Sequence, residues 1–227
     1  MEENLISIII PIYNESKIIE KTIEMLEPFK DKAEILFVDG GSTDDTLAKI
    51  PKGYKVINSP KGRAVQMNMG AKASSGNVLF FLHGDSELPS DAISEINRVM
   101  KEYDFGCFGI GFHTIDPIMK ICQFISNHRI IDRKVVFGDQ GIFIKRELFE
   151  KVGGFPGIPI MEDYEFSLRL KKLNIPIGRT KHKIYTSDRR FKPGRKLIIM
   201  WQMNRLRAMY RKGYDINILA DMYKDVR

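Results

Sequence analysis

Polar and acidic side chains follow three of the long apolar runs in this sequence. The three polar segments are residues 13–15 (Tyr-Asn-Glu), 39–42 (Asp-Gly-Gly-Ser) and 83–85 (His-Gly-Asp). If the apolar runs are strands of one parallel sheet, these segments lie together, because ligands of open parallel sheets bind beyond the carboxyl ends of the strands. The pattern therefore predicts a binding cleft with carboxylates at that edge.

The acidic character of this edge limits the chemistry it supports. The chain has no G-x-x-x-x-G-K-[ST] loop, and Gly106, Gly109 and Gly111 do not have the G-x-G-x-x-G spacing, so neither phosphate-cradling motif is present. An acidic edge that receives a diphosphate needs a divalent cation between the two. Mg²⁺ and Mn²⁺ suit carboxylate and phosphate oxygens, and we expect one of them here.

The elements that must position these residues alternate in type over the first 100 positions. Apolar runs predict strands at residues 7–13, 34–38, 54–58 and 78–82, separated by helical patterns that include 63–73 and one beginning after Pro89. Ser42 followed by Asp45 resembles a capping box and predicts a further helix. Continuous apolar strands alternating with helices indicate an α/β fold with a mostly parallel central sheet flanked by helices.

After residue 104 the pattern is less regular. We expect strands at 105–112, 141–144 and 184–186 and helices at 118–131, 146–152, 164–173 and 196–212. The 227 residues fit one domain with a C-terminal appendage. Cys107 and Cys122 form no C-x-x-C pair, which predicts reduced thiols. The acidic start lacks the basic segment of a signal peptide, so we expect a cytoplasmic location.

The basic charge is concentrated in the last quarter of the chain. Residues 171–227 contain 16 basic and 4 acidic side chains, whereas residues 1–170 contain 20 and 25. Within this quarter, residues 196–212 mix apolar side chains such as Trp201 and Leu206 with arginine and lysine. Such a helix either docks on the domain with a basic outer face or lies on an anionic membrane. Both interpretations remain open at this point.

Six segments together resemble the family 2 glycosyltransferases, which have the GT-A fold and use nucleotide-diphosphate sugars. The segments are 7–15 (SIIIPIYNE), 38–46 (VDGGSTDDT), 62–76, 82–85 (LHGD), 141–155 and Glu162-Asp163. The resemblance covers residues 5–173 and implies a glycosyltransferase domain over 1–173, with a basic helical extension over 174–227. It also implies metal-dependent, inverting transfer of a hexosyl or related group.

The resemblance assigns donor and metal roles to particular residues. Asp85 stands at the last position of the family's Asp-x-Asp motif and is expected to coordinate Mn²⁺ or Mg²⁺ on the donor diphosphate. His83 replaces the first Asp of that motif, where imidazole suits Mn²⁺ better than Mg²⁺. The residues expected to bind the nucleotide-sugar are Pro11, Tyr13, Glu15, Asp39, Asn68, His83, Asp85, Arg189 and Arg190.

The resemblance places the catalytic step at the acidic pair Glu162-Asp163. An inverting transfer needs a base for the acceptor hydroxyl, and we assign that role to Asp163, with Glu162 as the base or as an orienting group. Asp139 and Gln140 are expected to reach the acceptor. The family also suggests a lipid-linked acceptor and a peripheral position at the inner face of a membrane.

Two other functions compete with this interpretation. A nucleotidyltransferase of related fold would need a glycine- and lysine-rich phosphate loop after the first strand, which residues 14–17 do not supply. A noncatalytic module that binds a sugar nucleotide would need neither Asp85 nor Asp163. We expect no nucleic-acid partner.

Overall fold

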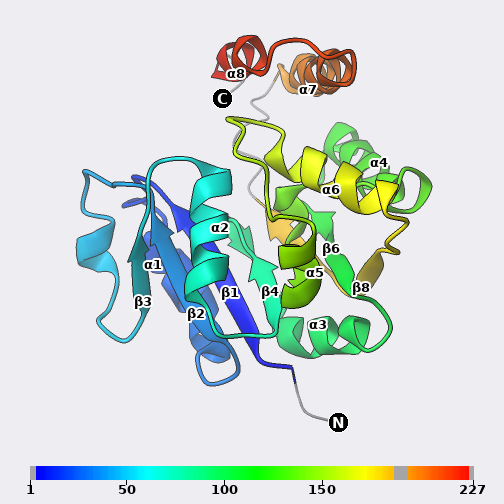
Figure 1. Ribbon diagram of the computed structural model, residues 1–227. Coiled ribbons are helices and arrows are strands. Elements are labelled where there is room, and N and C mark those ends of the chain that lie inside the picture. Colours follow the sequence, from blue (N-terminus) through cyan, green and yellow to red (C-terminus); the bar gives the residue numbers. More distant parts are fainter. Residues whose placement is uncertain (1–3, 187–193, 225–227) are drawn as a thin grey trace.

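The computed structural model describes residues 4–186 and 194–224, and within these ranges eight strands form one sheet (Figure 1). The strand order is β3-β2-β1-β4-β7-β6-β8-β5. The strands are β1 (Ile6–Ile12), β2 (Glu34–Asp39), β3 (Lys55–Asn58), β4 (Val78–Phe81), β5 (Ser86–Glu87), β6 (Phe105–Gly111), β7 (Ile142–Lys145) and β8 (Gly178–Thr186).

Helices cover both faces of this sheet. The α-helices in the described ranges are α1 (Ile19–Leu26), α2 (Arg63–Ala73), α3 (Ala92–Met100), α4 (Pro117–Asp132), α5 (Arg146–Lys151), α6 (Glu162–Lys172), α7 (Lys196–Arg211) and α8 (Ile216–Lys224). Short 3₁₀ turns are η1 (Glu27–Phe29), η2 (Leu47–Lys49) and η3 (Gly138–Gln140). The α/β architecture with flanking helices is as predicted.

The prediction of a mostly parallel sheet was wrong, because the sheet is mixed. The half formed by β3, β2, β1 and β4 is parallel, as the alternation of strands and helices indicated. In the other half, β7 inserts between β4 and β6 and runs antiparallel to both, and β5 pairs antiparallel with β8. Strand direction depends on which distant strand becomes the neighbour, and the apolar pattern of one run carries no information on that choice.

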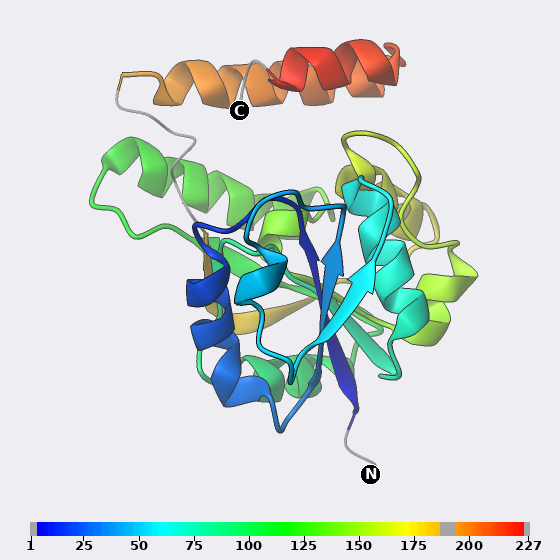
Figure 2. The ribbon, with the colours of Figure 1, turned by 90° about the vertical axis from the view of Figure 1, so that its left-hand side faces the viewer.

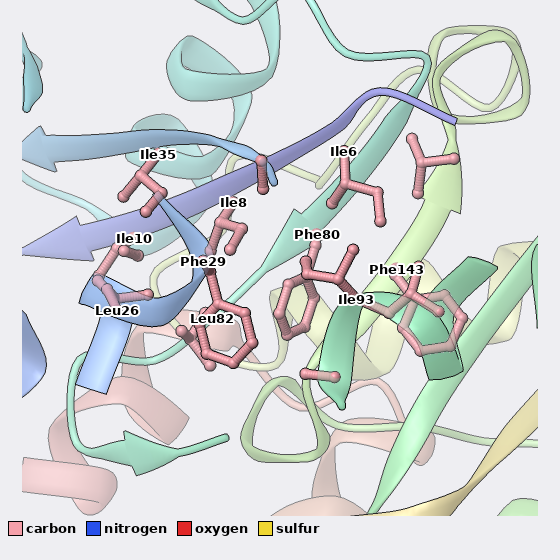
Figure 3. Packing of buried hydrophobic residues seen from close by; sticks show 14 of the residues in the cluster. Ile6, Ile8, Ile10, Leu26, Phe29, Ile35, Phe80, Leu82, Ile93 and Phe143 are labelled. Carbon is pink, nitrogen blue, oxygen red and sulfur yellow. The ribbon is translucent and has the colours of Figure 1, made fainter. Parts of the chain in front are cut away.

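The period-two alternation of β1 divides the core into two layers. Ile6, Ile8, Ile10 and Ile12 face α1 and α3 in a cluster that also contains Phe80 of β4 and Phe143 of β7 (Figure 3). Ile9 faces the opposite side, where α2, α5 and α6 supply the packing partners. A strand buried on both faces must be apolar at nearly every position, which explains the run of isoleucines.

Helix α2 packs unusually close to the strands because of one glycine. A methyl group at Gly70 would lie 2.4 Å from Cγ2 of Ile9 and 2.8 Å from Cγ2 of Val38. Neither distance is physically tolerable, so a side chain here would push the helix away from β1 and β2. The close approach brings the first turn of α2 to the carboxyl ends of these strands, where the polar segments lie.

Helices α7 and α8 form a layer above α4 and α6 (Figures 1 and 2). Ile199 and Leu206 of α7 and Leu219 of α8 are buried in one cluster with residues that precede or begin α6. Trp201, in contrast, is 59% exposed. The basic helix therefore docks through one face and leaves another face open. No helix in the described ranges has the length and apolar character needed to cross a membrane.

Candidate active site

The carboxyl ends of β1 and β2 are joined by a buried glutamine from α2. Nε2 of Gln66 donates to the carbonyl oxygens of Ile12 and Val38, each over 2.8 Å. Ile12 is the last residue of β1, and Val38 is the residue before the last of β2, so both carbonyls lie just before the polar segments. The sequence analysis did not identify Gln66, because a glutamine inside an apolar helical pattern usually faces solvent. Its two hydrogen bonds fix the separation of the two loops that line the site.

Asp39 is buried and organises the loop that follows β2. Its carboxylate accepts the backbone N–H of Gly41 at 3.0 Å and the hydroxyl of Ser42 at 2.5 Å, and it also accepts the backbone N–H of Ser42. The helix predicted from Ser42 and Asp45 is absent, and only the 3₁₀ turn η2 forms there. Ser42 does not cap a helix because Asp39 holds its hydroxyl. The role of Asp39 toward the nucleotide stays a prediction.

The loop after β1 is locked onto the loop after β2. The backbone N–H of Asn14 donates to the Ser42 hydroxyl over 2.9 Å, and Oδ1 of Asn14 accepts the N–H of Thr43 at 2.8 Å. The backbone N–H of Glu15 donates to Oγ1 of Thr46 over 2.7 Å. Asn14 has a positive φ of 52°, a conformation that asparagine tolerates better than most residues. The two loops therefore form one rigid wall.

Tyr13 is the first residue after β1 and belongs to this wall. Nζ of Lys61 lies 3.8 Å from the centroid of its ring, a cation–π contact. Pro11 is in β1, paired with Val38, and is only partly buried. Tyr13 and Glu15 are also partly buried. Tyr13 and Glu15 thus follow the end of β1, as predicted from the apolar pattern, and Pro11 lies within the strand. The contact of all three residues with a nucleoside stays a prediction.

His83 and Asp85 lie in a tight turn between β4 and β5. The N–H of Ser86 donates to the carbonyl of His83 over 3.1 Å, and the hydroxyl of Thr22 in α1 donates to the carbonyl of Gly84 over 2.6 Å. The turn is therefore anchored to α1. Both side chains are partly buried at the same sheet edge as the loops after β1 and β2.

The side chains of His83, in the turn after β4, and of Asp163, in the acidic pair, both lie close to the α-carbon of Gly138. A methyl group at Gly138 would lie 2.6 Å from Nε2 of His83 and 3.3 Å from Oδ2 of Asp163. The same Oδ2 accepts the backbone N–H of Gly138 at 2.7 Å, while Oδ1 of Asp163 accepts the N–H of Tyr164 at 2.6 Å. Asp163, the candidate base, and His83, in the candidate metal loop, are 80 positions apart in the chain. Both side chains therefore lie next to the same glycine.

Glu162 occupies a different environment from Asp163. Its side chain is 4% exposed and forms an ion pair with Arg63, in which Nη1 of Arg63 lies 3.1 Å from Oε1. Burial, and then the negative charge of Asp163, raise the pKa of Glu162 to about 7, while Arg63 opposes the shift. Met161, the residue before α6, has a φ of 63°. Such a left-handed conformation is costly for methionine and is often found at functional sites.

The other predicted residues are distributed around this centre. The side-chain amide of Asn68 donates to the carbonyl of Phe155 over 2.8 Å and accepts its N–H at 2.9 Å, so Asn68 tethers α2 to the segment before α6. Asp139 and Gln140 are in η3, directly after Gly138. Arg189 and Arg190 lie outside the described residues.

The donor set fits a cation that arrives with a diphosphate. No group of three or more His, Cys, Asp or Glu side chains in the described ranges converges as a metal site. Asp85 and His83 supply one carboxylate and one imidazole. Mg²⁺ in proteins is typically held by one or two carboxylates together with substrate phosphates and water, and Mn²⁺ takes the same oxygen ligands but suits an imidazole better. These two side chains therefore suit a shared site and would not make a closed cage.

Residues that the sequence analysis missed surround Phe137. Cζ of Arg129 in α4 lies 4.2 Å from the centroid of the Phe137 ring, and Cζ of Arg207 in α7 lies 5.3 Å from it. The ring also stacks on Tyr164 at 5.5 Å. Three elements far apart in the chain meet here, and only the high arginine content of the last quarter hinted at the cluster.

Solved structures share this fold. A mannosyltransferase from Pyrobaculum calidifontis, PcManGT, determined with GDP-Man and Mn²⁺, superposes with a TM-score of 0.66 over 98% of this chain and 70% of its own, at 19% identity. S. aureus TarS 1–349 gives a TM-score of 0.64 over 88% of this chain and 66% of its own, at 21% identity. The fold of this chain is therefore that of the GT-A type.

Sequence comparison then identifies the family. The family profile for glycosyl transferase family 2 matches residues 7–153, and the chain belongs to that family of enzymes. An uncharacterized glycosyltransferase of Haemophilus influenzae is 27% identical over 73% of this chain, which spans 62% of that relative's length. The glycosyltransferase AglE of Haloferax volcanii is 34% identical over 66% of this chain and 56% of its own length.

Proposed function

We propose that this protein transfers a glycosyl group from a nucleotide-diphosphate sugar to an acceptor hydroxyl, with inversion at the anomeric carbon. The observation that supports this most directly is the convergence of His83 and Asp163 on Gly138. It brings a carboxylate next to the turn that carries Asp85. Family membership and the donor complexes of the structural relatives agree with such a reaction.

The chemistry is a single displacement. The acceptor oxygen forms a bond to the anomeric carbon, the bond from that carbon to the β-phosphate oxygen breaks, and the electron pair leaves with the nucleoside diphosphate. Asp163 takes the acceptor proton. Its two oxygens already accept the N–H groups of Gly138 and Tyr164, but each carboxylate oxygen has a second lone pair. These bonds hold the carboxylate in one orientation.

Mn²⁺ or Mg²⁺, bound by Asp85 with His83, would stabilise the charge on the departing diphosphate. The remaining tasks belong to the chain itself. The wall built by the loops after β1 and β2 orients the nucleoside, with Tyr13 at its surface and the buried Asp39 holding the second loop in shape. The Arg63–Glu162 pair fixes the start of α6, and so the position of Asp163, relative to α2.

The proposal is tested by measuring donor binding and donor hydrolysis with and without the metal. UDP- and GDP-sugars are screened by calorimetry in Mn²⁺ and in excess EDTA. We expect metal-dependent binding in the wild type and its loss in Asp85→Ala, while Asp31→Ala, exposed and remote, behaves as the wild type. Full binding in EDTA contradicts the metal role. Binding without any transfer or hydrolysis favours a noncatalytic module, and pyrophosphate release from a nucleoside triphosphate favours a nucleotidyltransferase.

We also propose that the acceptor is lipid-linked and that the protein acts at the cytoplasmic face of a membrane. Two helices in contact, α4 and α7, carry large exposed apolar side chains. Phe124 is 68% exposed, Leu197 63% and Trp201 59%. Exposed basic residues accompany them, including Lys120 and Lys212. This combination of apolar and positive groups complements an anionic bilayer surface.

A further inference from the structure

Two arginines from distant helices share one aromatic ring beside the candidate active site. Arg129 of α4 and Arg207 of α7 both lie against Phe137, with Cζ 4.2 Å and 5.3 Å from the ring centroid. We call these two side chains the guanidinium pair. Both are partly buried. Two positive charges beside the same partly buried ring disfavour each other's charged form, and a negative group beside them offsets this effect.

The described residues neutralise this pair only in part. Neither Arg129 nor Arg207 forms an ion pair within 4.0 Å of a carboxylate in the described ranges. Among the described residues, Arg207 donates within its own helix, to the carbonyl of Met203 and to Oδ1 of Asn204. Nε of Arg129 is buried and has no hydrogen-bond partner among the described residues. A buried cationic donor in this condition is unfavourable, and an anion would relieve it.

Burial disfavours the charged form of both arginines. Burial, and then the charge of Arg207, lower the pKa of Arg129 to about 10, and burial lowers the pKa of Arg207 as well. Asp139 is the carboxylate that opposes both shifts. One carboxylate facing two guanidinium groups leaves net positive charge. Nε2 of Gln140, whose Oε1 accepts the N–H of Phe137, is a second buried donor without a partner in the described part of the chain.

We propose that the guanidinium pair binds a phosphate group carried by the acceptor. The inference rests on the proposed glycosyl transfer, because it adds an acceptor class to the same site. Arginine forks match phosphate oxygens in geometry and charge. Phe137 directly precedes Gly138, whose N–H holds Asp163, so the phosphate site and the base share one short segment. The donor diphosphate, by contrast, is assigned to the turn at Asp85.

The test separates phosphate binding from donor binding. Calorimetry measures the affinity of the full chain for inorganic phosphate, pyrophosphate and a short prenyl phosphate, and separately for UDP and GDP with Mn²⁺. We expect Arg129→Gln and Arg207→Gln each to weaken phosphate and pyrophosphate binding at least tenfold and to leave nucleoside diphosphate binding within twofold. The matched control is Arg205→Gln, an exposed arginine of the same helix that lies over Trp201.

Further variants and outcomes keep the proposal falsifiable. Arg129→Lys and Arg207→Lys keep the charge but lose the fork, so we expect intermediate losses, and retained nucleoside diphosphate binding shows that each variant is folded. Tighter binding of prenyl phosphate than of inorganic phosphate identifies a lipid source, and equal binding identifies a soluble one. Wild-type affinity for phosphate in the glutamine variants overturns the proposal. So does an equal loss of nucleoside diphosphate binding, which would assign the pair to the donor.

Phosphate binding without any nucleoside diphosphate binding contradicts the proposed transfer while supporting the anion site.

Discussion

Nη1 of Arg63, the first residue of α2, lies 3.1 Å from Oε1 of Glu162, the first residue of α6, although 99 positions separate them in the chain. This ion pair joins the helix that clamps β1 and β2 to the helix that carries the candidate base. The Glu162 side chain is 4% exposed, and that of Arg63 is 33% exposed. The pair is therefore partly screened on the arginine side, and its carboxylate is poorly solvated.

The first prediction concerns stability as a function of pH. Because the folded-state pKa of Glu162 is raised from 4.5 to about 7, the folded state binds more protons than the unfolded state between those values. The free energy of unfolding from this group is largest below pH 4.5 and falls as the pH rises to about 7. We expect a loss of about 1–3 kcal/mol over this window, since each pKa unit corresponds to about 1.4 kcal/mol and Arg63 is partly solvated.

Chemical denaturation at a series of pH values measures this effect. Glu162→Gln keeps an oxygen for Arg63 but does not titrate, so its unfolding free energy should change less between pH 4.5 and pH 7 than that of the wild type. Glu147→Gln replaces an exposed glutamate in the first turn of α5 and serves as the control. Identical pH dependence in Glu162→Gln and the wild type would show that Glu162 has an ordinary pKa in the folded state.

The second prediction concerns the glycine between His83 and Asp163. Gly138→Ala introduces a methyl group 2.6 Å from Nε2 of His83, so the imidazole or the turn that carries it must move. The φ of Gly138 is not positive, and alanine can adopt the backbone conformation. We therefore expect a folded protein whose donor turnover falls at least tenfold, because small displacements of reacting groups are costly.

Gly157→Ala is the matched control, because a methyl group at Gly157 meets no atom within 4 Å. Thermal unfolding and donor hydrolysis are measured for both variants. A Gly138→Ala protein with wild-type turnover would mean that His83 and Asp163 do not act in a shared space.

The elements that were predictable from sequence are those with local causes. The run of isoleucines in β1 and the spacing of Ala64, Met67 and Ala71 in α2 reflect burial on a strand and on a helix face. Strand direction in the second half of the sheet has no local cause. The placement of β7 beside β4 depends on Phe143 packing against Phe80, with ring centroids 6.4 Å apart, a contact between residues far apart in the chain.

The candidate site divides in the same way. Asp85 and Asp163 are predicted because their short motifs resemble those of the family, and their roles stay predictions. The structure places the two segments that carry them next to Gly138. The prediction of a helix after Ser42 was wrong, because the buried carboxylate of Asp39 binds the hydroxyl that would cap it. The cluster of Arg129, Phe137 and Arg207 depends on the docking of α7 against the domain. No pattern within α4 or α7 alone reveals which basic residues face inward.

The third prediction concerns the base. Asp163→Asn keeps one of the two oxygens, and with it one of the hydrogen bonds from the N–H groups of Gly138 and Tyr164, but it cannot take a proton at neutral pH. We expect turnover to fall by about 10²-fold or more while nucleoside diphosphate affinity stays within a few fold. Glycosyl transfer and calorimetry are measured on the same preparation, with Asp31→Asn, exposed and remote, as the control. Near-normal turnover would move the base to Glu162 or Asp139.

The last prediction concerns the membrane face. Binding to vesicles with anionic lipid should exceed binding to neutral vesicles, since each basic residue near an anionic surface contributes about 1 kcal/mol. It should weaken when salt is raised to 1 M, where the Debye length falls to about 3 Å. Trp201→Ser and Phe124→Ser remove apolar groups of the exposed faces of α7 and α4, each worth about 1.5–3 kcal/mol if buried in the interface. We therefore expect at least a tenfold loss in vesicle co-sedimentation for each.

Leu173→Ser, a 54% exposed leucine at the end of α6, is the matched control. Equal binding to both lipids, or unchanged binding in the Trp201 and Phe124 variants, would contradict the membrane role. Helix α7 would then serve only to dock on the domain through buried residues such as Leu206.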